Sequence, residues 1–247
     1  MLAQTEKVTQ LNIAEVKQFV VPSEKLAQDR SITVYLPKSY QSTNKDYATL
    51  YLLDGERHLP HAILATRLHQ ELNNIPEMII VAINNKEEDG AREQDLFHNR
   101  VAFRHFITSE LRSYITENYR ASDSAILYGH SLAGFFALDL IATQPQHFSR
   151  VIAASPPLQG DAKRIYSQLS EHKLQKQTYL YLTIAAQHEE GEPEFSAFQR
   201  FSKLLAESTP ENLIWTSQVM AEQSHISNYY LTFFNGIAKV YDTEVKK

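Results

Sequence analysis

SAILYGHSLAG, residues 124–134, places a serine at the junction between a strand pattern and a helix pattern. Its first five residues form a short apolar run, typical of a buried parallel strand, and the residues after Ser131 have the pattern of a helix. A turn this tight strains the backbone of the serine and requires small neighbours, which Gly129, Ala133 and Gly134 provide. The sequence therefore predicts a corner that lifts the Ser131 hydroxyl clear of a sheet, beside the amide groups that begin a helix.

The serine motif is by itself a weak signal. The pattern G-x-S-x-G occurs by chance in many proteins, and Ala133 stands here where that pattern has its last glycine. The alternative is an ordinary strand-to-helix turn that contains a serine. Whether Ser131 is a nucleophile therefore depends on what the rest of the chain places beside it.

The composition is that of an ordinary globular protein. The chain has 247 residues, of which 43% are hydrophobic and 21% charged, and no linker-like stretch divides it. We expect one α/β domain spanning residues 1–247. A net charge of -5 gives no electrostatic reason to expect nucleic acid or an anionic membrane as a partner.

Cysteine usage and targeting signals narrow the chemistry further. The chain has no cysteine, which excludes disulfides, thiolate metal sites and a cysteine nucleophile. Residues 1–10 lack the basic start and the apolar run of a signal peptide, and no stretch is long enough for a membrane span. We expect no membrane insertion, while the compartment, cytoplasmic or periplasmic, and the oligomeric state stay open.

Strand patterns and helix patterns alternate along the chain. The first two predicted strands resemble an antiparallel hairpin, and the later alternation implies right-handed crossovers and a mostly parallel sheet with helices on both faces. Ligands of such sheets gather at the carboxyl ends of the strands. We expect strands at 15–21, 31–36, 48–53, 78–83, 124–128, 151–155, 178–185 and 213–219, and helices at 60–72 (opened by Pro60), 103–119, after Ser131, and at 162–169, 195–205 and 228–241.

A serine hydroxyl needs a base to remove its proton. Of the ten histidines, His225 follows the last predicted strand and precedes the last helix, where an open-sheet hydrolase places its base. The alternative for His225 is a surface loop histidine. His130 is expected to point away from Ser131 and to pack against or orient a neighbouring residue. His58 and His61 could bind a metal together, but no third ligand stands at a recognisable spacing from them.

The imidazole in turn needs a carboxylate to hold its tautomer. The acidic stretch AQHEEGEPE follows the strand at 178–185, between the serine and the histidine in chain order. We choose Glu189 as the acid, with Glu190 next and Asp161 and Glu222 as remoter alternatives. A solvated acidic loop is the other interpretation of this stretch.

Two N–H donors are needed for the oxyanion of a tetrahedral intermediate. The backbone N–H of Leu132 is one candidate because it begins the helix after the serine. The turn at Asp54 and Gly55 is placed to offer the N–H of Glu56 as the second. A simple tight turn at Gly55 is the alternative.

Five motifs along the chain are together similar to one known group of enzymes. They are YLLDGERH (51–58), VAINN (81–85), LYGHSLAGFFAL (127–138), FSRVIAASPPL (148–158) and QSHIS (223–227). In this order they resemble the landmarks of the esterase D superfamily of α/β-hydrolases, and in particular its bacterial branch of enterochelin and salmochelin esterase-like serine hydrolases. The resemblance covers about residues 30–241.

The resemblance implies a serine hydrolase that acts on esters, with Ser131 and His225 as its catalytic pair. Glu56 matches the position whose amide serves the oxyanion hole in relatives such as the mycolyltransferases. The resemblance identifies the acidic residue less directly, because some siderophore-esterase relatives work with a serine-histidine pair alone. The cysteine-containing segment of S-formylglutathione hydrolases is absent, which argues against glutathione thioesters as substrates.

The sequence thus predicts an α/β-hydrolase that cleaves a small-molecule carboxylic ester without cofactor or metal. We expect a substrate pocket lined by Gly55, by the loop 92–98 and by Pro156, Pro157 and Leu158. Arg92 is expected either to bind an anionic or catechol-type group or to be an exposed structural arginine. Two alternatives stay open: an acyltransferase of the same fold, and a homologue that binds a siderophore or similar ligand without turnover.

Overall fold

The central feature of the computed structural model is one sheet, and the structure describes residues 14–85, 90–172 and 174–242. Within these ranges, eight strands lie in the order β1-β2-β4-β3-β5-β6-β7-β8. The β1–β2 hairpin and the β2–β4 pair are antiparallel, and the remaining pairs are parallel. The strands are β1 (Val16–Ser23), β2 (Gln28–Tyr35), β3 (Tyr47–Leu52), β4 (Met78–Ile83), β5 (Ala121–His130), β6 (Arg150–Ala154), β7 (Thr178–Ala185) and β8 (Leu213–Met220).

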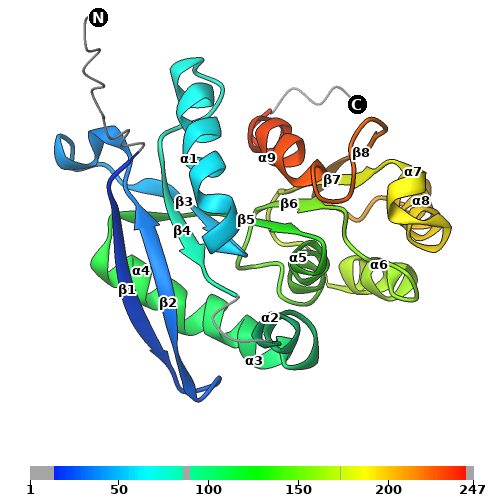
Figure 1. Cartoon of the computed structure of the whole chain (residues 1–247), viewed down its shortest axis with the longest axis horizontal. Coiled ribbons are helices and arrows are strands. Elements are labelled where there is room, and N and C mark those ends of the chain that lie inside the picture. The colour runs from blue at the N-terminus through cyan, green and yellow to red at the C-terminus, as the bar shows by residue number, and fades with distance from the viewer. Residues whose placement is uncertain (1–13, 86–89, 173, 243–247) are drawn as a thin grey trace, which may run out of the picture.

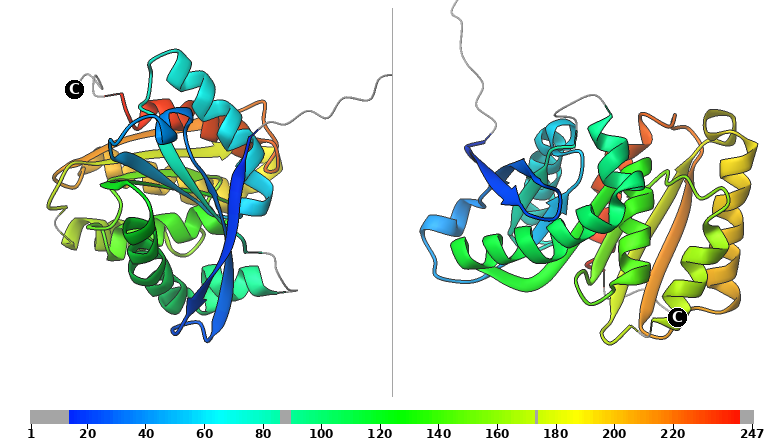
Figure 2. Two further views of the ribbon diagram at one scale, coloured as in Figure 1. Left: turned by 90° about the vertical axis from the view of Figure 1, so that its left-hand side faces the viewer. Right: turned by 90° about the horizontal axis from the view of Figure 1, so that it is seen from below.

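Helices cover both faces of this sheet (Figure 1), and Figure 2 shows the sheet between the two helical layers from two further directions. The helices α1 and α9 lie on one face, and α3 to α6 with α8 lie on the other. The predicted α/β-hydrolase architecture is confirmed. The helices are α1 (Gly55–Glu71), α2 (Ala91–Glu93), α3 (Arg100–His105), α4 (Arg112–Asn118), α5 (Leu132–Thr143), α6 (Ala162–Glu171), α7 (Gln187–Glu190), α8 (Glu192–Glu207) and α9 (Asn228–Lys239), with the short turns η1 (Lys38–Gln41), η2 (Gln94–His98) and η3 (Phe106–Leu111).

The apolar strands explain why the sheet is buried on both faces. β4 and β7 have no exposed residue, as expected for central parallel strands with continuous hydrophobic runs. One face packs against residues such as Ile63 of α1 and Phe233 of α9, and the other against Phe136 of α5 and Phe201 of α8. The core therefore consists of two layers, one on each side of the strands.

The turn from β5 into α5 has the strained geometry that the sequence predicts. Ser131 has φ 57° and ψ -126°, a region that residues other than glycine rarely adopt. The Ser131 N–H donates to the carbonyl of Ala154 on the neighbouring strand at 2.8 Å. A Cβ on Gly129 would lie 2.2 Å from the Ala133 carbonyl oxygen, and one on Gly134 would lie 3.0 Å from that of Ala154. The close backbone approach thus requires small residues on both sides of the serine.

Several boundaries differ from the sequence prediction, most of them by one to three residues. α1 begins at Gly55 rather than at Pro60, because the sharp turn at Asp54 (φ 51°) starts the helix directly after β3. The predicted helix at 103–119 corresponds to three consecutive helical segments, α3, η3 and α4, which together span residues 100–118. None of the helices in the described part of the chain is long and apolar enough to cross a membrane.

Replacing Gly129 by alanine tests the tight packing of this turn. We expect Gly129→Ala to lower the free energy of unfolding by about 3 kcal/mol, because its Cβ would overlap a backbone carbonyl that cannot move freely. Gly160→Ala is the control, since Gly160 has φ 85° and a Cβ added there would meet no atom within 4 Å, and only about 1 kcal/mol of backbone strain is expected there. Urea unfolding measures both variants; equal losses would contradict the packing argument.

Candidate active site

Three polar side chains meet at the carboxyl ends of the strands. Ser131 follows β5, Glu190 ends the short helix α7 after β7, and His225 lies between β8 and α9. His225 Nε2 is 3.0 Å from Ser131 Oγ, and His225 Nδ1 is 2.7 Å from Glu190 Oε2. The imidazole therefore bridges a hydroxyl and a carboxylate that are 59 positions apart in the sequence.

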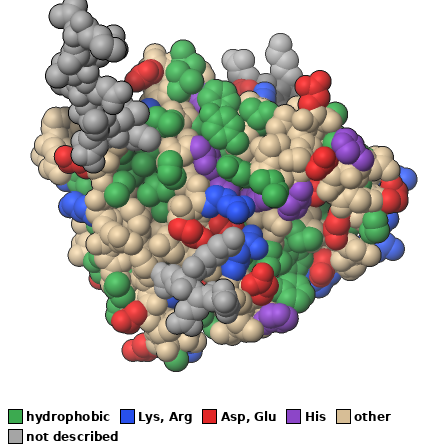
Figure 3. All heavy atoms as spheres, in the orientation of Figure 1, with side chains coloured by type: hydrophobic (Ala, Val, Ile, Leu, Met, Phe, Trp, Pro, Cys, Tyr) green, Lys and Arg blue, Asp and Glu red, His purple; other side chains and the backbone are tan. Residues whose placement is uncertain are grey.

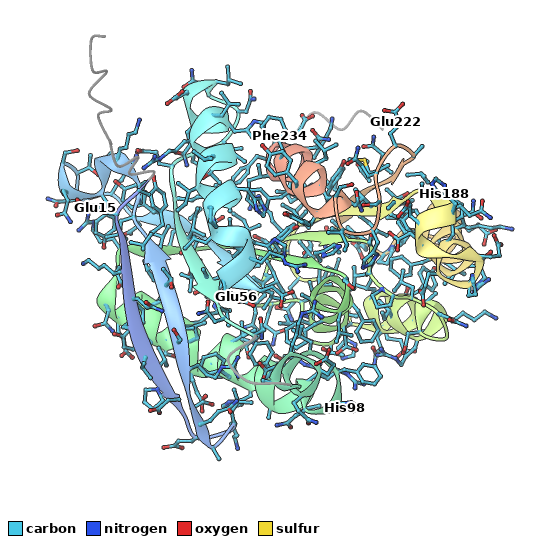
Figure 4. All side chains as sticks on the ribbon, in the orientation of Figure 1. Glu15, Glu56, His98, His188, Glu222 and Phe234 are labelled. Carbon is cyan, nitrogen blue, oxygen red and sulfur yellow. The ribbon has the colours of Figure 1, made fainter. Side chains whose placement is uncertain are left out.

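The carboxylate beside His225 belongs to Glu190, so the choice of Glu189 is corrected. Residues 187–190 form a single helical turn, which directs successive side chains about 100° apart. Glu189 therefore points outward, with 40% of its side chain exposed and the exposed ring of His188 as its neighbour at 3.7 Å. Figure 4 labels His188 at the outer edge of the molecule. Glu190, by contrast, has only 5% of its side chain exposed.

Hydrogen bonds keep the buried Glu190 carboxylate ionised. Burial acts to raise the pKa of Glu190, but hydrogen bonds from His225, Ser155 and the Ala185 amide outweigh it and hold the pKa below its ordinary value. The Ala185 N–H donates to Glu190 Oε1 at 3.1 Å. A carboxylate of this kind can hold an imidazole in one tautomer and stabilise its protonated form.

His130 holds the loop that carries His225. Its Nε2–H donates to the His225 carbonyl oxygen at 2.8 Å, and the two rings lie 4.9 Å apart. Burial and the neighbouring His225 lower the pKa of His130 to about 4, so this ring is neutral near pH 7. The orienting role predicted for His130 agrees with this hydrogen bond, and the residue lines the same cavity as Ser131.

His58 and His61 lie beneath the site on α1 rather than in a metal centre. Burial lowers the pKa of His58 to about 2 and that of His61 to about 4. Both ring nitrogens of His58 lack a hydrogen-bond partner among the described residues, and the ring packs 4.7 Å from that of Tyr229. No group of three or more His, Cys, Asp or Glu residues in the described ranges could hold a metal ion.

A cavity of about 200 Å³ opens directly onto Ser131 and His225. Figure 3 shows histidine, arginine and acidic side chains gathered near the centre of this face. The residues that line the cavity are Asp54, Glu56, Arg57, Arg92, His130, Ser131, His225 and Ile226. The pocket is therefore small, and polar side chains and the exposed Ile226 together form its lining.

Arg92 lines this cavity but is already bound to a carboxylate. Its Nε and Nη2 donate to the two carboxylate oxygens of Asp54 at 2.8 and 2.9 Å, and Nη2 also reaches the His130 carbonyl at 3.3 Å. This bidentate pair neutralises both charges and fixes the turn after β3. The expected role of Arg92 in binding an anionic substrate is therefore not supported by this geometry.

The other predicted pocket residues do not line the cavity. A Cβ on Gly55 would lie 2.7 Å from both Ala82 Cβ and the Ile83 nitrogen, so Gly55 serves the close packing of α1 on β4. Leu158 is fully buried, and its N–H donates to the carboxylate of Glu194 on α8 at 2.8 Å. Pro156 and Pro157 precede it in the same segment and are likewise absent from the lining of this cavity.

Leu132 and Glu56 occupy the two helix starts beside the serine. Leu132 is the first residue of α5, so its amide has no helical carbonyl to bind. Glu56 lies in the first turn of α1 and lines the same cavity as Ser131; Figure 4 labels it at the central end of that helix. Asn85, to which the sequence alone assigns no role, accepts the Asp54 N–H through its Oδ1 at 3.0 Å and stabilises this turn.

Fold and site together define an α/β-hydrolase with a serine, a histidine and a buried carboxylate at the strand ends. The family model described as "Putative esterase" matches residues 23–236, and the chain belongs to this family. It is therefore an ester-hydrolysing enzyme. Among curated proteins, no relative matches the sequence.

Solved structures from several organisms share the fold. An IroE-like serine hydrolase from Shewanella oneidensis has a TM-score of 0.79 and 22% identity, over 91% of this chain and 79% of that one. The BES protein from Bacillus cereus has a TM-score of 0.80 and 20% identity, over 96% and 99% of the two chains. The siderophore hydrolase EstB from Aspergillus nidulans has a TM-score of 0.76 and 16% identity, over 98% and 99%.

The buried neutral histidines predict a loss of stability in mild acid. In the unfolded chain a histidine takes up a proton near pH 6.5, whereas folded His58 does so only near pH 2. As the pH falls below 6.5, the unfolded state therefore gains protons that the folded state does not bind. Each such histidine lowers the free energy of unfolding by about 1.4 kcal/mol per pH unit until its folded pKa is reached.

His58→Phe isolates this contribution. The phenyl ring fills the same apolar site without unpaired nitrogens, so between pH 6 and 4.5 the stability of the variant should fall less steeply, by about 1 kcal/mol per pH unit. Urea unfolding at several pH values measures the slopes. His98→Phe, at an exposed ring, serves as the control; a slope for His58→Phe equal to that of the wild type would contradict the assignment.

Proposed function

We propose that the protein hydrolyses a small carboxylic ester through an acyl-enzyme on Ser131. His225 Nε2 accepts the hydroxyl proton of Ser131 while the oxygen attacks the ester carbonyl, and Glu190 stabilises the imidazolium that forms. The proton then passes from His225 to the departing alcohol. Water enters next, is activated by the same imidazole, and releases the carboxylic acid from Ser131.

One observation supports this proposal above all others. A single imidazole lies 3.0 Å from the Ser131 hydroxyl and 2.7 Å from the Glu190 carboxylate, both within hydrogen-bond range for proton transfer. With Glu190 ionised, the ring carries its proton on Nδ1 and leaves the Nε2 lone pair facing Ser131. This is the tautomer that a general base needs.

The amides of Leu132 and Glu56 are our candidates for the oxyanion hole. Both belong to the first turns of helices whose N-terminal ends adjoin Ser131 and its cavity. Helix N-termini favour negative charge, so the developing oxyanion would be stabilised there. The cavity of about 200 Å³ favours a small group next to the reacting carbonyl. Because relatives of the same fold include a siderophore hydrolase, siderophore esters belong in the substrate panel beside short acyl esters.

Ser131→Ala tests the nucleophile. We expect turnover of a short p-nitrophenyl ester to fall by about 10⁴-fold or more, because no other hydroxyl contacts His225 in the hydrogen bonds of the described residues. Thermal unfolding of the variant shows whether the fold is retained. Substantial remaining activity in a folded variant would mean that another group is the nucleophile.

A neighbouring pair of glutamates tests the acid with a built-in control. Glu190→Gln removes the charge that His225 contacts, and its kcat should fall by about 100-fold or more. Glu189→Gln makes the same chemical change at the adjacent exposed carboxylate and should alter kcat by less than about 2-fold. Steady-state kinetics on one ester compares them; a larger loss in Glu189→Gln would reverse our assignment.

A further inference from the structure

A buried polar network adjoins Glu190, and its members do not line the cavity. Ser155 follows β6 and is 2% exposed, and Asn228 begins α9 and is fully buried. Asn228 Nδ2 lies 2.7 Å from Ser155 Oγ. The Ala185 N–H donates both to Ser155 Oγ at 3.3 Å and to Glu190 Oε1 at 3.1 Å, which places the serine hydroxyl beside the Glu190 carboxylate. The carboxylate that faces His225 is thus linked through Ser155 to the start of α9.

Two N–H groups in this network can only donate hydrogen bonds, and this fixes where the hydroxyl proton lies. The Asn228 amide nitrogen and the Ala185 N–H, 3.3 Å from Ser155 Oγ, both use lone pairs of the serine oxygen. The hydroxyl proton of Ser155 is then left for an acceptor, and the Glu190 carboxylate, which shares the Ala185 N–H with Ser155 and whose pKa a hydrogen bond from Ser155 helps to lower, is that acceptor. Ser155 therefore acts as a donor to Glu190.

A closed ring of side chains fixes the orientation of Asn228. The Thr232 hydroxyl donates to Asn228 Oδ1 at 3.0 Å, and Asn228 Nδ2 also donates to Thr183 Oγ1 at 3.1 Å. The two threonine hydroxyls are 2.6 Å apart, so Thr183 donates to Thr232 and completes the ring. All three residues are fully buried. The amide nitrogen of Asn228 is thereby held toward Ser155, where it forces the serine proton toward Glu190.

The backbone of Ser155 points to a role for its side chain. Ser155 has φ 42°, a conformation that glycine adopts more easily than serine. A residue that served the turn alone would be better replaced by glycine. The strain and the three hydrogen-bond partners together indicate that the hydroxyl itself is what this position supplies.

We propose that Ser155 is a positioning residue whose hydroxyl, oriented by Asn228, holds the Glu190 carboxylate in place against His225. The inference rests on the proposed ester-hydrolase chemistry of the site. Because Asn228 lies three residues after His225, the same helix start anchors both the base and the support of its acid. Ser155 acts on the reaction only through Glu190 and does not touch the substrate.

Ser155→Gly is the most direct test, since glycine suits the backbone while removing the donor. Without that donor the Glu190–His225 pair becomes more basic, whichever of its members takes the proton. We expect the acidic limb of the kcat/KM profile to move to higher pH by about half a unit or more, and kcat/KM on the plateau to fall by about 5- to 50-fold.

The matched control removes an equally buried hydroxyl elsewhere. Thr66 is fully buried in α1, where its hydroxyl donates to the Ala62 carbonyl at 2.8 Å. Thr66→Val should leave both the pH profile and kcat/KM unchanged. A fall in kcat/KM of Ser155→Gly without a shift of its acidic limb would give Ser155 a merely structural role and overturn the proposal.

A second readout separates this inference from the proposed function. The NMR signal of the His225 ring, assigned by its loss in His225→Gln, reports proton uptake by the pair without any turnover. A higher midpoint pH in Ser155→Gly than in the wild type supports the positioning contact even if no ester is hydrolysed, in which case the proposed function alone fails. An unchanged midpoint overturns the positioning role even in an active esterase.

Discussion

The strained backbone of Ser131 is the constraint on which the site depends. A residue other than glycine at φ 57° and ψ -126° carries roughly 1–3 kcal/mol of strain, which the surrounding structure must hold. The hydrogen bond to Ala154 fixes the residue from the neighbouring strand, and the close approach at Gly129 leaves no room for a wider turn. The hydroxyl is thereby aimed away from the sheet toward His225. Without this corner, a serine at the end of β5 would lie in the strand and face the core.

Around the serine, charges are held by protein hydrogen bonds rather than by solvent. Glu190 keeps its ionised form through three donors, although its side chain is 5% exposed. Asp54 and Arg92 neutralise one another at the edge of the cavity. His130 stays neutral and fixes the His225 carbonyl. These groups need little rearrangement when charge develops on the imidazole and the substrate oxygen, which is the condition for electrostatic stabilisation of a transition state.

The sequence predicts the sheet well because central parallel strands are continuous apolar runs. The predicted ranges of β4 and β7 therefore agree with the observed ones. The sequence also predicts the meeting of Ser131 and His225, since both follow strands whose carboxyl ends share one edge. It does not distinguish Glu190 from Glu189, because that choice depends on the side-chain directions within a single helical turn. The sequence does not predict the residues that line the cavity, for a related reason. Whether a loop residue such as Leu158 faces the cavity depends on side-chain directions that tertiary packing sets.

The central claim is that Ser131 is an activated nucleophile, and its chemical reactivity can be measured directly. Wild-type protein incubated with a fluorophosphonate, then digested and mapped by mass spectrometry, should carry one phosphonyl group per chain on the peptide containing Ser131. The reaction should slow by several orders of magnitude when His225 is replaced by alanine, because the hydroxyl then lacks its base. Folded wild-type protein that stays unlabelled, or that is labelled at another residue, would contradict the account.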